Sequence, residues 1–263
     1  MTDTTRLKDK VVIVTGGGSG IGKGACLRIA AEGAKIAILD IRQEIAEAVA
    51  SEIKSAGGDA IALKCNVAVE DEVAAAVATT VSTYGGLHGM VANAGTVGSG
   101  WIHETSLHDW HAVLNVNLTG PFLCAKYAIP HFIEAGGGSY VVTSSIAGSV
   151  IGAGGAAASY AVSKSGVIAL AKQIAVDYGA QNIRANAIQP GAVADSNLGK
   201  HVREDRLGHD TPAATLPRPK AWLPLRRQGA LSEYGATIAF LLSDDAGYIT
   251  GTSIPVDGGY LAT

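Results

Sequence analysis

The two residues best placed to do chemistry are Tyr160 and Lys164, which lie four positions apart in the segment Ser159-Tyr-Ala-Val-Ser-Lys164. The segment opens an apolar-periodic stretch that predicts a helix, so both side chains should project from one face. A free phenol titrates near about 10, and a neighbouring ammonium is expected to lower that pKa by favouring the phenolate. The pair can therefore move a proton, although an ordinary amphipathic helix shows the same spacing.

The elements that must position this pair alternate between short β-branched runs and segments of helical length. Strands are predicted at residues 11–15, 36–39, 60–63, 90–93, 140–143, 183–188 and 253–256, and helices at 20–32, 43–56, 69–84, 107–131 and 160–178. This alternation predicts an α/β fold, a Rossmann-type doubly wound parallel sheet of about seven strands with helices on both faces. We expect a single domain over residues 1–263, with ligands bound outside the carboxyl ends of the strands.

Composition excludes several functional classes. Of the 263 residues, 48% are hydrophobic and 16% charged, and the net charge is −3 with no long basic run, which argues against a nucleic-acid partner. The uncharged stretch between Glu134 and Lys164 is rich in glycine, serine and alanine, so we interpret it as protein interior and expect no membrane span. Cys26, Cys65 and Cys124 lie far apart in apolar surroundings, and the N-terminus is polar. These features favour reduced thiols in a cytoplasmic protein.

A glycine-rich loop follows the first predicted strand, as Thr15-Gly-Gly-Gly-Ser-Gly-Ile-Gly22. Glycines allow the backbone to approach a pyrophosphate, and the helix that follows offers unpaired N–H groups and a favourable dipole. The spacing of Gly16, Gly20 and Gly22 differs from the common G-x-G-x-x-G form. Its place between a strand and a helix nevertheless predicts a dinucleotide site.

Asp40 closes the second predicted strand, about twenty residues beyond the glycines, where a carboxylate can accept hydrogen bonds from the adenosine ribose. A 2′-phosphate at that place would meet like charge. Arg42 lies two residues further on and offers an alternative partner for such a phosphate. The sequence thus favours NAD(H) over NADP(H) as cofactor.

Taken together, these motifs resemble the short-chain dehydrogenase/reductase family over nearly the whole chain. The matching segments are the glycine loop 15–22, Asn93-Ala-Gly95, Asn117 in Asn-Leu-Thr-Gly, Ser145, Tyr160-x-x-x-Lys164, Pro190-Gly191 and Val256-Asp-Gly-Gly259. Cys65-Asn66-Val67 fits the segment that flanks adenine, with asparagine where the family most often has aspartate. The family tends to form homotetramers, which is therefore expected here.

The resemblance implies a catalytic role for four residues. Tyr160 would be the general acid or base, Ser145 would bind the same substrate oxygen, and Lys164 would lower the phenol pKa and hold the nicotinamide ribose. Asn117 would bind a water that carries protons toward solvent. Ser144 competes with Ser145 for its role, and Asn117, like the nearby Asn115, could instead do no more than cap or bridge elements of the fold.

The resemblance also implies a set of residues that contact the cofactor. They are Gly16, Ser19, Gly20, Ile21, Gly22, Asp40, Ile41, Asn66, Val67, Asn93, Ala94, Gly95, Tyr160, Lys164, Pro190, Gly191, Val193 and Ser196. Of these, Ser196 stands beside Asp195 where the family usually places threonine, so this contact departs from the pattern.

Two further segments mark where substrate specificity should be set. The spacing from Ser145 to Tyr160 exceeds the family norm, with residues 154–158 as the apparent insertion. Residues 197–227 contain four prolines and no clear periodicity, which predicts a substrate lid. Trp101, His103 and Trp222 are candidates for the pocket wall. His108 and His111 share a helix face, but without a third ligand at a recognisable spacing they do not predict a metal site.

The leading hypothesis is an NAD-dependent oxidoreductase that transfers a hydride between nicotinamide and a secondary alcohol or ketone. One alternative is a non-catalytic NAD(H)-sensing regulatory protein on the same scaffold, which would not need Ser145, Tyr160 and Lys164 together. A second alternative is an epimerase or dehydratase acting on a nucleotide sugar. The chain length and the spacing of Gly16, Gly20 and Gly22 argue against the second alternative.

Overall fold

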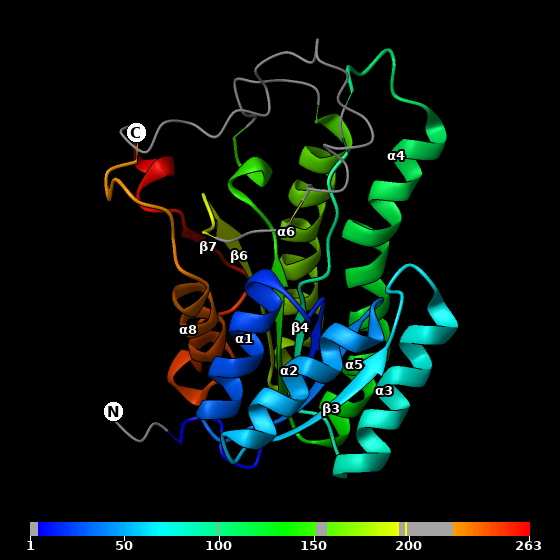
Figure 1. Cartoon of the computed structure of the whole chain (residues 1–263), viewed down its shortest axis with the longest axis vertical. Coiled ribbons are helices and arrows are strands. Elements are labelled where there is room, and N and C mark those ends of the chain that lie inside the picture. The colour runs from blue at the N-terminus through cyan, green and yellow to red at the C-terminus, as the bar shows by residue number, and fades with distance from the viewer. Residues whose placement is uncertain (1–4, 99, 151–156, 195–197, 199–222) are drawn as a thin grey trace.

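The computed structural model describes residues 5–98, 100–150, 157–194, 198 and 223–263. Within them, seven parallel strands form one sheet in the order β3-β2-β1-β4-β5-β6-β7 (Figure 1). The strands are β1 (Val11–Thr15), β2 (Lys35–Asp40), β3 (Asp59–Lys64), β4 (Gly89–Ala92), β5 (Gly138–Thr143), β6 (Ile183–Pro190) and β7 (Ser253–Val256). The predicted doubly wound parallel α/β fold is confirmed, and each predicted strand corresponds to an observed one.

The strands are continuous apolar runs because both faces of the sheet are covered. In β1, Val11 and Ile13 belong to one hydrophobic core, whereas Val12 and Val14 belong to the other. The two-residue period of a strand thus divides one short run between two layers of helices.

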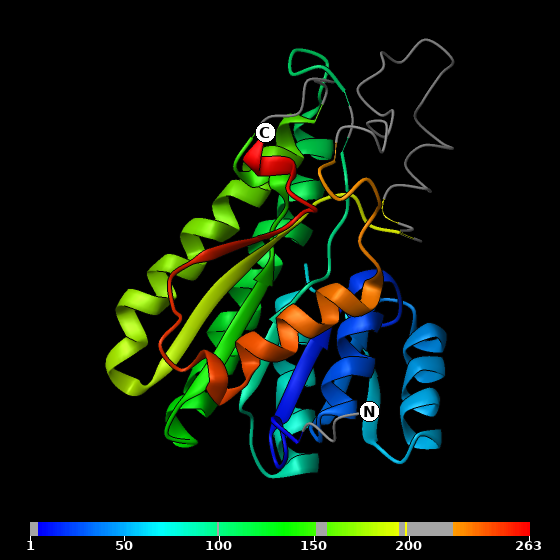
Figure 2. The ribbon, with the colours of Figure 1, turned by 90° about the vertical axis from the view of Figure 1, so that its left-hand side faces the viewer.

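Helices cover both faces of the sheet (Figure 2). One face carries α1 (Gly20–Ala31), α2 (Gln43–Ser55) and α8 (Leu231–Leu242), and the other carries α3 (Glu70–Tyr84), α5 (Gly120–Glu134) and α6 (Ala158–Tyr178). The shorter α4 (Leu107–Leu114) leads into α5. No helix among the described residues is both long and apolar enough to cross a membrane.

The single helix predicted at 107–131 is interrupted by a π-helical turn at Asn115–Thr119. Here the Gly120 N–H donates to the carbonyl of Asn115, five residues earlier. Pro121 has no N–H, so it cannot make the α-helical hydrogen bond to the Asn117 carbonyl four residues before it. The wider turn accommodates this missing donor within one continuous helical path.

Helix α8 was not among the predicted elements. Gly235 in its middle lowers helix propensity, but a Cβ at this position would overlap the Gly24 carbonyl of α1. A Cβ at Gly24 would in turn lie 2.6 Å from the Leu231 carbonyl oxygen. The two glycines therefore let α1 and α8 pack closely, and this tertiary contact outweighs the local propensity.

The predicted lid at 197–227 lies largely outside the described residues, as do Ser196, Trp222 and most of the insertion at 154–158. The structure describes both ends of the connection between β6 and α8, and these two ends lie side by side. Val193 pairs with Gly229, where the Ala194 N–H donates to the Gly229 carbonyl and the Gly229 N–H to the Ala192 carbonyl, each at 2.9 Å.

Candidate active site

The glycine loop has the shape that a phosphate group requires. Gly16 and Gly20 have positive φ angles of 62° and 52°, a region that favours glycine. A Cβ at Gly22 would overlap the Gly16 carbonyl, whereas a Cβ at Gly20 would meet nothing within 4 Å. Gly20 thus faces open space at the N-terminus of α1, where no acidic residue stands in the first turn. The loop fits a pyrophosphate bound at the helix dipole.

Asp40 lies at the carboxyl end of β2 beside this loop and is 7% exposed. Its Oδ2 accepts a hydrogen bond from the Gly18 N–H and its Oδ1 accepts one from the Arg42 N–H, both at 3.1 Å. The carboxylate therefore ties the glycine loop to the end of β2, while the neighbouring Ile41 is exposed. This position matches the place where a ribose hydroxyl is bound in such folds.

Asn93 and Thr15 join the two halves of the sheet at the cleft. The Asn93 amide nitrogen donates to the Thr15 carbonyl at 3.1 Å, and its amide oxygen accepts from the Thr143 hydroxyl at 3.1 Å. The Thr15 hydroxyl accepts from the N–H groups of Asn93 and Ala94, each at 3.0 Å. These bonds hold the ends of β1, β4 and β5 in fixed relation.

Asn66, Val67 and Gly191, which are predicted to contact the cofactor, also lie at the carboxyl ends of strands. After β3, the Asn66 side-chain oxygen accepts from the Ala68 N–H at 3.1 Å, and Val67 is buried. At the end of β6, the Gly191 N–H donates to the Val256 carbonyl at 3.1 Å. A Cβ on Gly191 would approach the Asp257 Cα to 2.7 Å, so this residue must be small.

Ser145, Tyr160 and Lys164 come together at the end of β5 and the start of α6. The Ser145 hydroxyl faces the Tyr160 phenol closely enough for a side-chain hydrogen-bonding interaction to act on the phenol pKa. Lys164 is buried, its Nζ lies 5.7 Å from the centre of the Tyr160 ring, and it donates to the Thr143 carbonyl at 2.8 Å. A serine hydroxyl, a phenol and an ammonium thus converge at the carboxyl end of β5, which Thr143 and Asn93 connect to the start of the glycine loop.

Burial dominates the electrostatics of this group. It raises the pKa of Tyr160 above the usual value, and the hydrogen bond from Ser145 acts in the opposite direction. Burial also lowers the pKa of Lys164 to about 8. The expected lowering of the phenol pKa by Lys164 is therefore not found in this structure. The ammonium lies over the ring and is bonded to Thr143, and desolvation is the largest influence on the phenol pKa, ahead of the Ser145 interaction.

The two serines that compete for the catalytic role have different partners. The Ser144 hydroxyl donates to the Lys164 main-chain carbonyl at 2.6 Å and so fastens β5 to α6. The Ser145 hydroxyl accepts from the Ala147 N–H at 3.1 Å and contacts Tyr160. Only Ser145 has its hydroxyl at the phenol.

The Asn117 side chain is buried and engaged within the protein. Its Oδ1 accepts from the Thr96 N–H at 2.8 Å, and its Nδ2 donates to the Thr96 carbonyl at 2.8 Å and to the Ser163 hydroxyl at 3.2 Å. A Cβ at Gly95 would lie 3.4 Å from Asn117 Oδ1 and 3.6 Å from Lys164 Nζ. Asn117 and Lys164 therefore flank the same glycine.

Sequence reasoning missed Thr96, Thr143 and Gln189 as parts of the site, and it named Thr15 only as the first residue of the glycine loop. Each is uncharged and common, so residue type carries no signal. The usable signal was position, because Thr15, Thr143 and Gln189 lie at the carboxyl ends of β1, β5 and β6. Conversely, His108 and His111 are exposed on α4, and the described residues contain no group of three metal-binding side chains.

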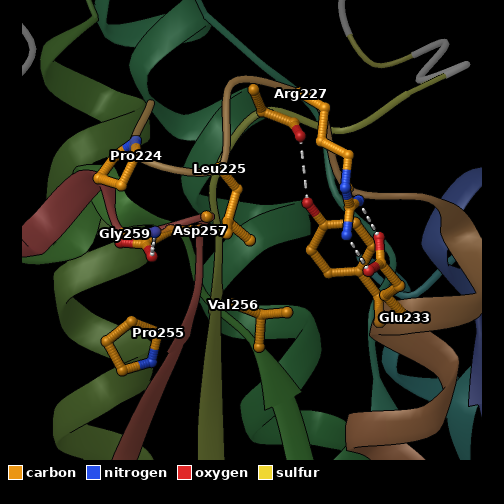
Figure 3. A pocket seen from close by; sticks show the side chains of 12 residues that line it. Pro224, Leu225, Arg227, Glu233, Pro255, Val256, Asp257 and Gly259 are labelled. Atoms are coloured by element: carbon orange, nitrogen blue, oxygen red, sulfur yellow. Dashed lines mark hydrogen bonds and ion pairs between the residues drawn. The ribbon is translucent and has the colours of Figure 1, made fainter. Parts of the chain in front are cut away.

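A pocket of about 420 Å³ lies away from Ser145 and Tyr160, between β7 and the start of α8 (Figure 3). Arg227 forms a two-pronged ion pair with Glu233 at 2.7 Å, and the Tyr234 hydroxyl donates to the Ala192 carbonyl at 3.2 Å. The bond between Tyr234 and Ala192 joins the segments on either side of residues 195–222, next to the end of β6.

The chain has relatives of known activity along its full length. A family model described as enoyl-(acyl carrier protein) reductase matches residues 16–261. 2-(S)-Hydroxypropyl-CoM dehydrogenase 3 of Xanthobacter autotrophicus is 35% identical, over 98% of this chain and 99% of that protein. Cyclohexanol dehydrogenase of an Acinetobacter species is 36% identical, over 98% and 97%. 2,5-Dichloro-2,5-cyclohexadiene-1,4-diol dehydrogenase of Sphingobium indicum is 38% identical, over 97% and 98%.

Solved structures agree with these relatives. A short-chain type dehydrogenase/reductase from Mycobacterium marinum superposes with a TM-score of 0.90 at 30% identity, over 99% of both chains. A putative NAD(P)-dependent gluconate 5-dehydrogenase from Beutenbergia cavernae, crystallised with NADP, superposes with a TM-score of 0.86 at 29% identity, over 99% of this chain and 100% of the other. The protein therefore belongs to the short-chain dehydrogenase/reductase family, a family of nicotinamide-dependent oxidoreductases that act on alcohol groups.

Proposed function

We propose that the protein is an NAD(H)-dependent oxidoreductase that interconverts a secondary alcohol and its ketone, with Tyr160 as general acid and base. The observation that carries this proposal is the meeting of Ser145, Tyr160 and Lys164 at the carboxyl end of β5. A phenol that touches a second hydroxyl and lies under a buried ammonium is suited to exchange a proton with a substrate oxygen.

In the direction of ketone reduction, Tyr160 donates its proton to the carbonyl oxygen. Its raised pKa keeps the phenol protonated at neutral pH, which suits this step. The Ala147 N–H bonds the Ser145 oxygen and so orients the Ser145 hydroxyl proton toward the same substrate oxygen, where it stabilises developing charge. The nicotinamide, when bound, supplies the hydride. In alcohol oxidation Tyr160 takes the proton, which is favoured as pH rises.

Lys164 and Asn117 complete the proposed proton route. Lys164 holds the nicotinamide ribose, and its charge stabilises the phenolate whenever Tyr160 has given up its proton. The Asn117 side chain is already bonded to Thr96 and Ser163, so we place the water of the relay at its main-chain carbonyl. This carbonyl lacks its α-helical donor because residue 121 is proline.

The proposed cofactor site follows the cleft from the glycine loop to the end of β6. The charge of Asp40 supports NAD(H), since a 2′-phosphate would be repelled, although Arg42 is exposed two residues away. The residues proposed to contact the cofactor are Gly16, Ser19, Gly20, Ile21, Gly22, Asp40, Ile41, Asn66, Val67, Asn93, Ala94, Gly95, Tyr160, Lys164, Pro190, Gly191, Val193 and Ser196.

We further propose that the substrate is an alcohol or ketone carried on a six-membered carbon ring. Cyclohexanol and a dichlorocyclohexadienediol name the activities of two relatives that match nearly the whole chain. Gly100 pairs with Ala157 at the start of α6, which brings the exposed apolar Trp101 and Ile102 to the same end of the sheet as Tyr160. Apolar side chains at this end of the sheet suit an uncharged ring.

We expect the protein to be a cytoplasmic homotetramer. Its three cysteines are free and buried, as suits a reducing compartment. Sedimentation analysis of the purified protein tests the assembly, and a monomer would contradict this part of the proposal.

Tyr160→Phe tests the central assignment. We expect kcat for cyclohexanol oxidation and cyclohexanone reduction to fall by about 10³-fold or more, within the range of general acid–base catalysis. NADH affinity, followed by fluorescence, should stay within about twofold. Tyr178→Phe, a change of the same type at the far end of α6, serves as the control and should retain activity.

Two results would refute the proposal. If Tyr160→Phe keeps wild-type turnover, the phenol is not the acid or base. If the wild-type protein binds NADH but reduces no carbonyl in a panel of cyclic, aromatic, sugar and acyl compounds, the protein is a sensor on the same scaffold.

A further inference from the structure

Gln189 is a buried amide, 2% exposed, at the carboxyl end of β6, and each of its polar atoms has a partner. Its Nε2 donates to the Ser145 main-chain carbonyl at 3.2 Å and to the Ser149 hydroxyl at 2.5 Å. Its Oε1 accepts from the Ser253 hydroxyl of β7 at 2.6 Å. One side chain thus joins β6 and β7 to residues 145–149, which we call the Ser145 turn.

Gln189 bonds the Ser145 turn at both ends. Between these ends lies a 3-10 helix, Ile146–Gly148, whose N-cap is Ser145 and whose C-cap is Ser149. Inside the turn, the Ala147 N–H donates to the Ser145 hydroxyl oxygen at 3.1 Å, and the Gly148 N–H donates to the Ser145 carbonyl at 2.9 Å. The turn therefore sets the direction of the Ser145 hydroxyl, and Gln189 fixes the turn against the sheet.

We propose that Gln189 is a positioning residue that holds Ser145 in the geometry needed to bind the substrate oxygen. The inference rests on the proposed function, since it assigns a purpose to the placement of Ser145. Gln189 has no hydrogen bond to Tyr160 or Lys164, so it acts through Ser145. The effect of Gln189 is on position alone. A displacement of about 1 Å at a reacting group can reduce a rate by about 100-fold.

The chain offers a matched control on the same strand. Asn186 is also a fully buried amide of β6, and its side chain donates to the Ile249 carbonyl at 2.8 Å and accepts from the Thr252 N–H at 3.2 Å. These partners lie in the segment before β7 and not in the Ser145 turn. Loss of this amide should weaken the fold without moving Ser145.

The test compares Gln189→Met, which removes the amide at similar length, with Asn186→Leu. We expect Gln189→Met to lower kcat for cyclohexanone reduction about 10- to 100-fold while KM for NADH changes less than about twofold. Asn186→Leu should keep kcat within about twofold. When Ser145→Ala is already present, adding Gln189→Met should lower kcat by less than about a further twofold, because both residues act through the Ser145 hydroxyl.

Hydrogen exchange gives a readout that is independent of activity. The Ala147 and Gly148 amides should exchange at least about tenfold faster in Gln189→Met than in Asn186→Leu. If Gln189→Met does not fold, Gln189→Glu, which keeps the shape but loses the donors, takes its place. Unchanged exchange in the turn overturns the inference, and so does an equal loss of kcat in the control. An inactive wild-type protein would instead overturn the proposed function, and the exchange result would still decide whether Gln189 holds the turn.

Discussion

The carboxylate of Asp40 carries the proposed preference for NAD(H), and Asp40→Asn removes its charge with the least disturbance. Both carboxylate oxygens accept main-chain N–H groups, one from Gly18 and one from Arg42, each at 3.1 Å. An asparagine keeps one amide oxygen as an acceptor, whereas alanine would leave both N–H groups without this partner. The substitution therefore removes the charge while keeping one of the two main-chain hydrogen bonds that Asp40 accepts.

The size of the effect follows from Coulomb's law. Two unit charges about 4 Å apart at an effective dielectric constant of about 20 repel by about 4 kcal/mol. We halve this value because a bound 2′-phosphate would lie at the open edge of the cleft and be partly screened, which leaves about 2 kcal/mol, or about 30-fold in affinity. NAD(H) loses a charged hydrogen-bond acceptor, a loss of about 1.5 kcal/mol and thus about tenfold.

The assay measures kcat/KM for NADH and NADPH with one saturating ketone. We expect NADPH efficiency to rise about 30-fold and NADH efficiency to fall about tenfold in Asp40→Asn. Asp59→Asn changes the net charge equally, but Asp59 begins β3 and so lies at the amino end of the strands, opposite Asp40. The ratio of NADPH to NADH efficiency should therefore not change in this variant. Unfolding curves should show both variants folded at the assay temperature.

An unchanged ratio in Asp40→Asn would refute the reasoning, because no like-charge repulsion would then operate at the end of β2. A rise of NADPH efficiency in Asp59→Asn as well would attribute the effect to the overall charge of the protein.

Two further predictions concern titration. Since burial lowers the pKa of Lys164 to about 8, half of its charge is lost at that pH and nearly all of it is present below about pH 7. We expect kcat/KM for ketone reduction to be level from pH 6 to about 7 and to fall at higher pH, and a rate that stays level to pH 10 would exclude the proposed role of the Lys164 charge. Burial raises the pKa of Glu32, but hydrogen bonds from Arg6 and Arg28 outweigh it and leave that pKa below its usual value. Glu32→Gln should therefore lower the free energy of unfolding at pH 7 by about 2 kcal/mol, less than for a fully buried pair because both arginines are partly exposed. The depressed carboxylate stabilises the fold above the unfolded pKa of about 4.3, so this difference should shrink as pH falls below that value; equal urea midpoints at pH 7 would contradict the prediction.

The sheet could be predicted from the sequence because its strands are buried on both faces. Such strands appear in the sequence as unbroken apolar runs, for example Val11 to Val14. Helix α8 escaped prediction because Gly235 weakens a helix locally and is required only by its contact with Gly24 of α1. A packing partner more than two hundred positions away leaves no local pattern.

The site shows the same division. Spacing alone placed Tyr160 and Lys164 on one helical face, and they lie together in the structure. The pKa of Tyr160 is raised and not lowered because burial, which the sequence does not reveal, has the largest effect on it. Gln189 escaped notice because a glutamine gains importance only through what it touches, here Ser145 and Ser149.

The main-chain pairing of Val193 with Gly229 has a consequence for how the length of the chain between them can vary. Both ends of the intervening stretch are fastened to each other by main-chain bonds, and main-chain bonds do not depend on side-chain identity. For a flexible loop, doubling the length raises the entropic free-energy cost of bringing its ends together by only about 0.6 kcal/mol. The sequence between these two ends can therefore change in length at little cost to the main-chain bonds that join Val193 and Gly229.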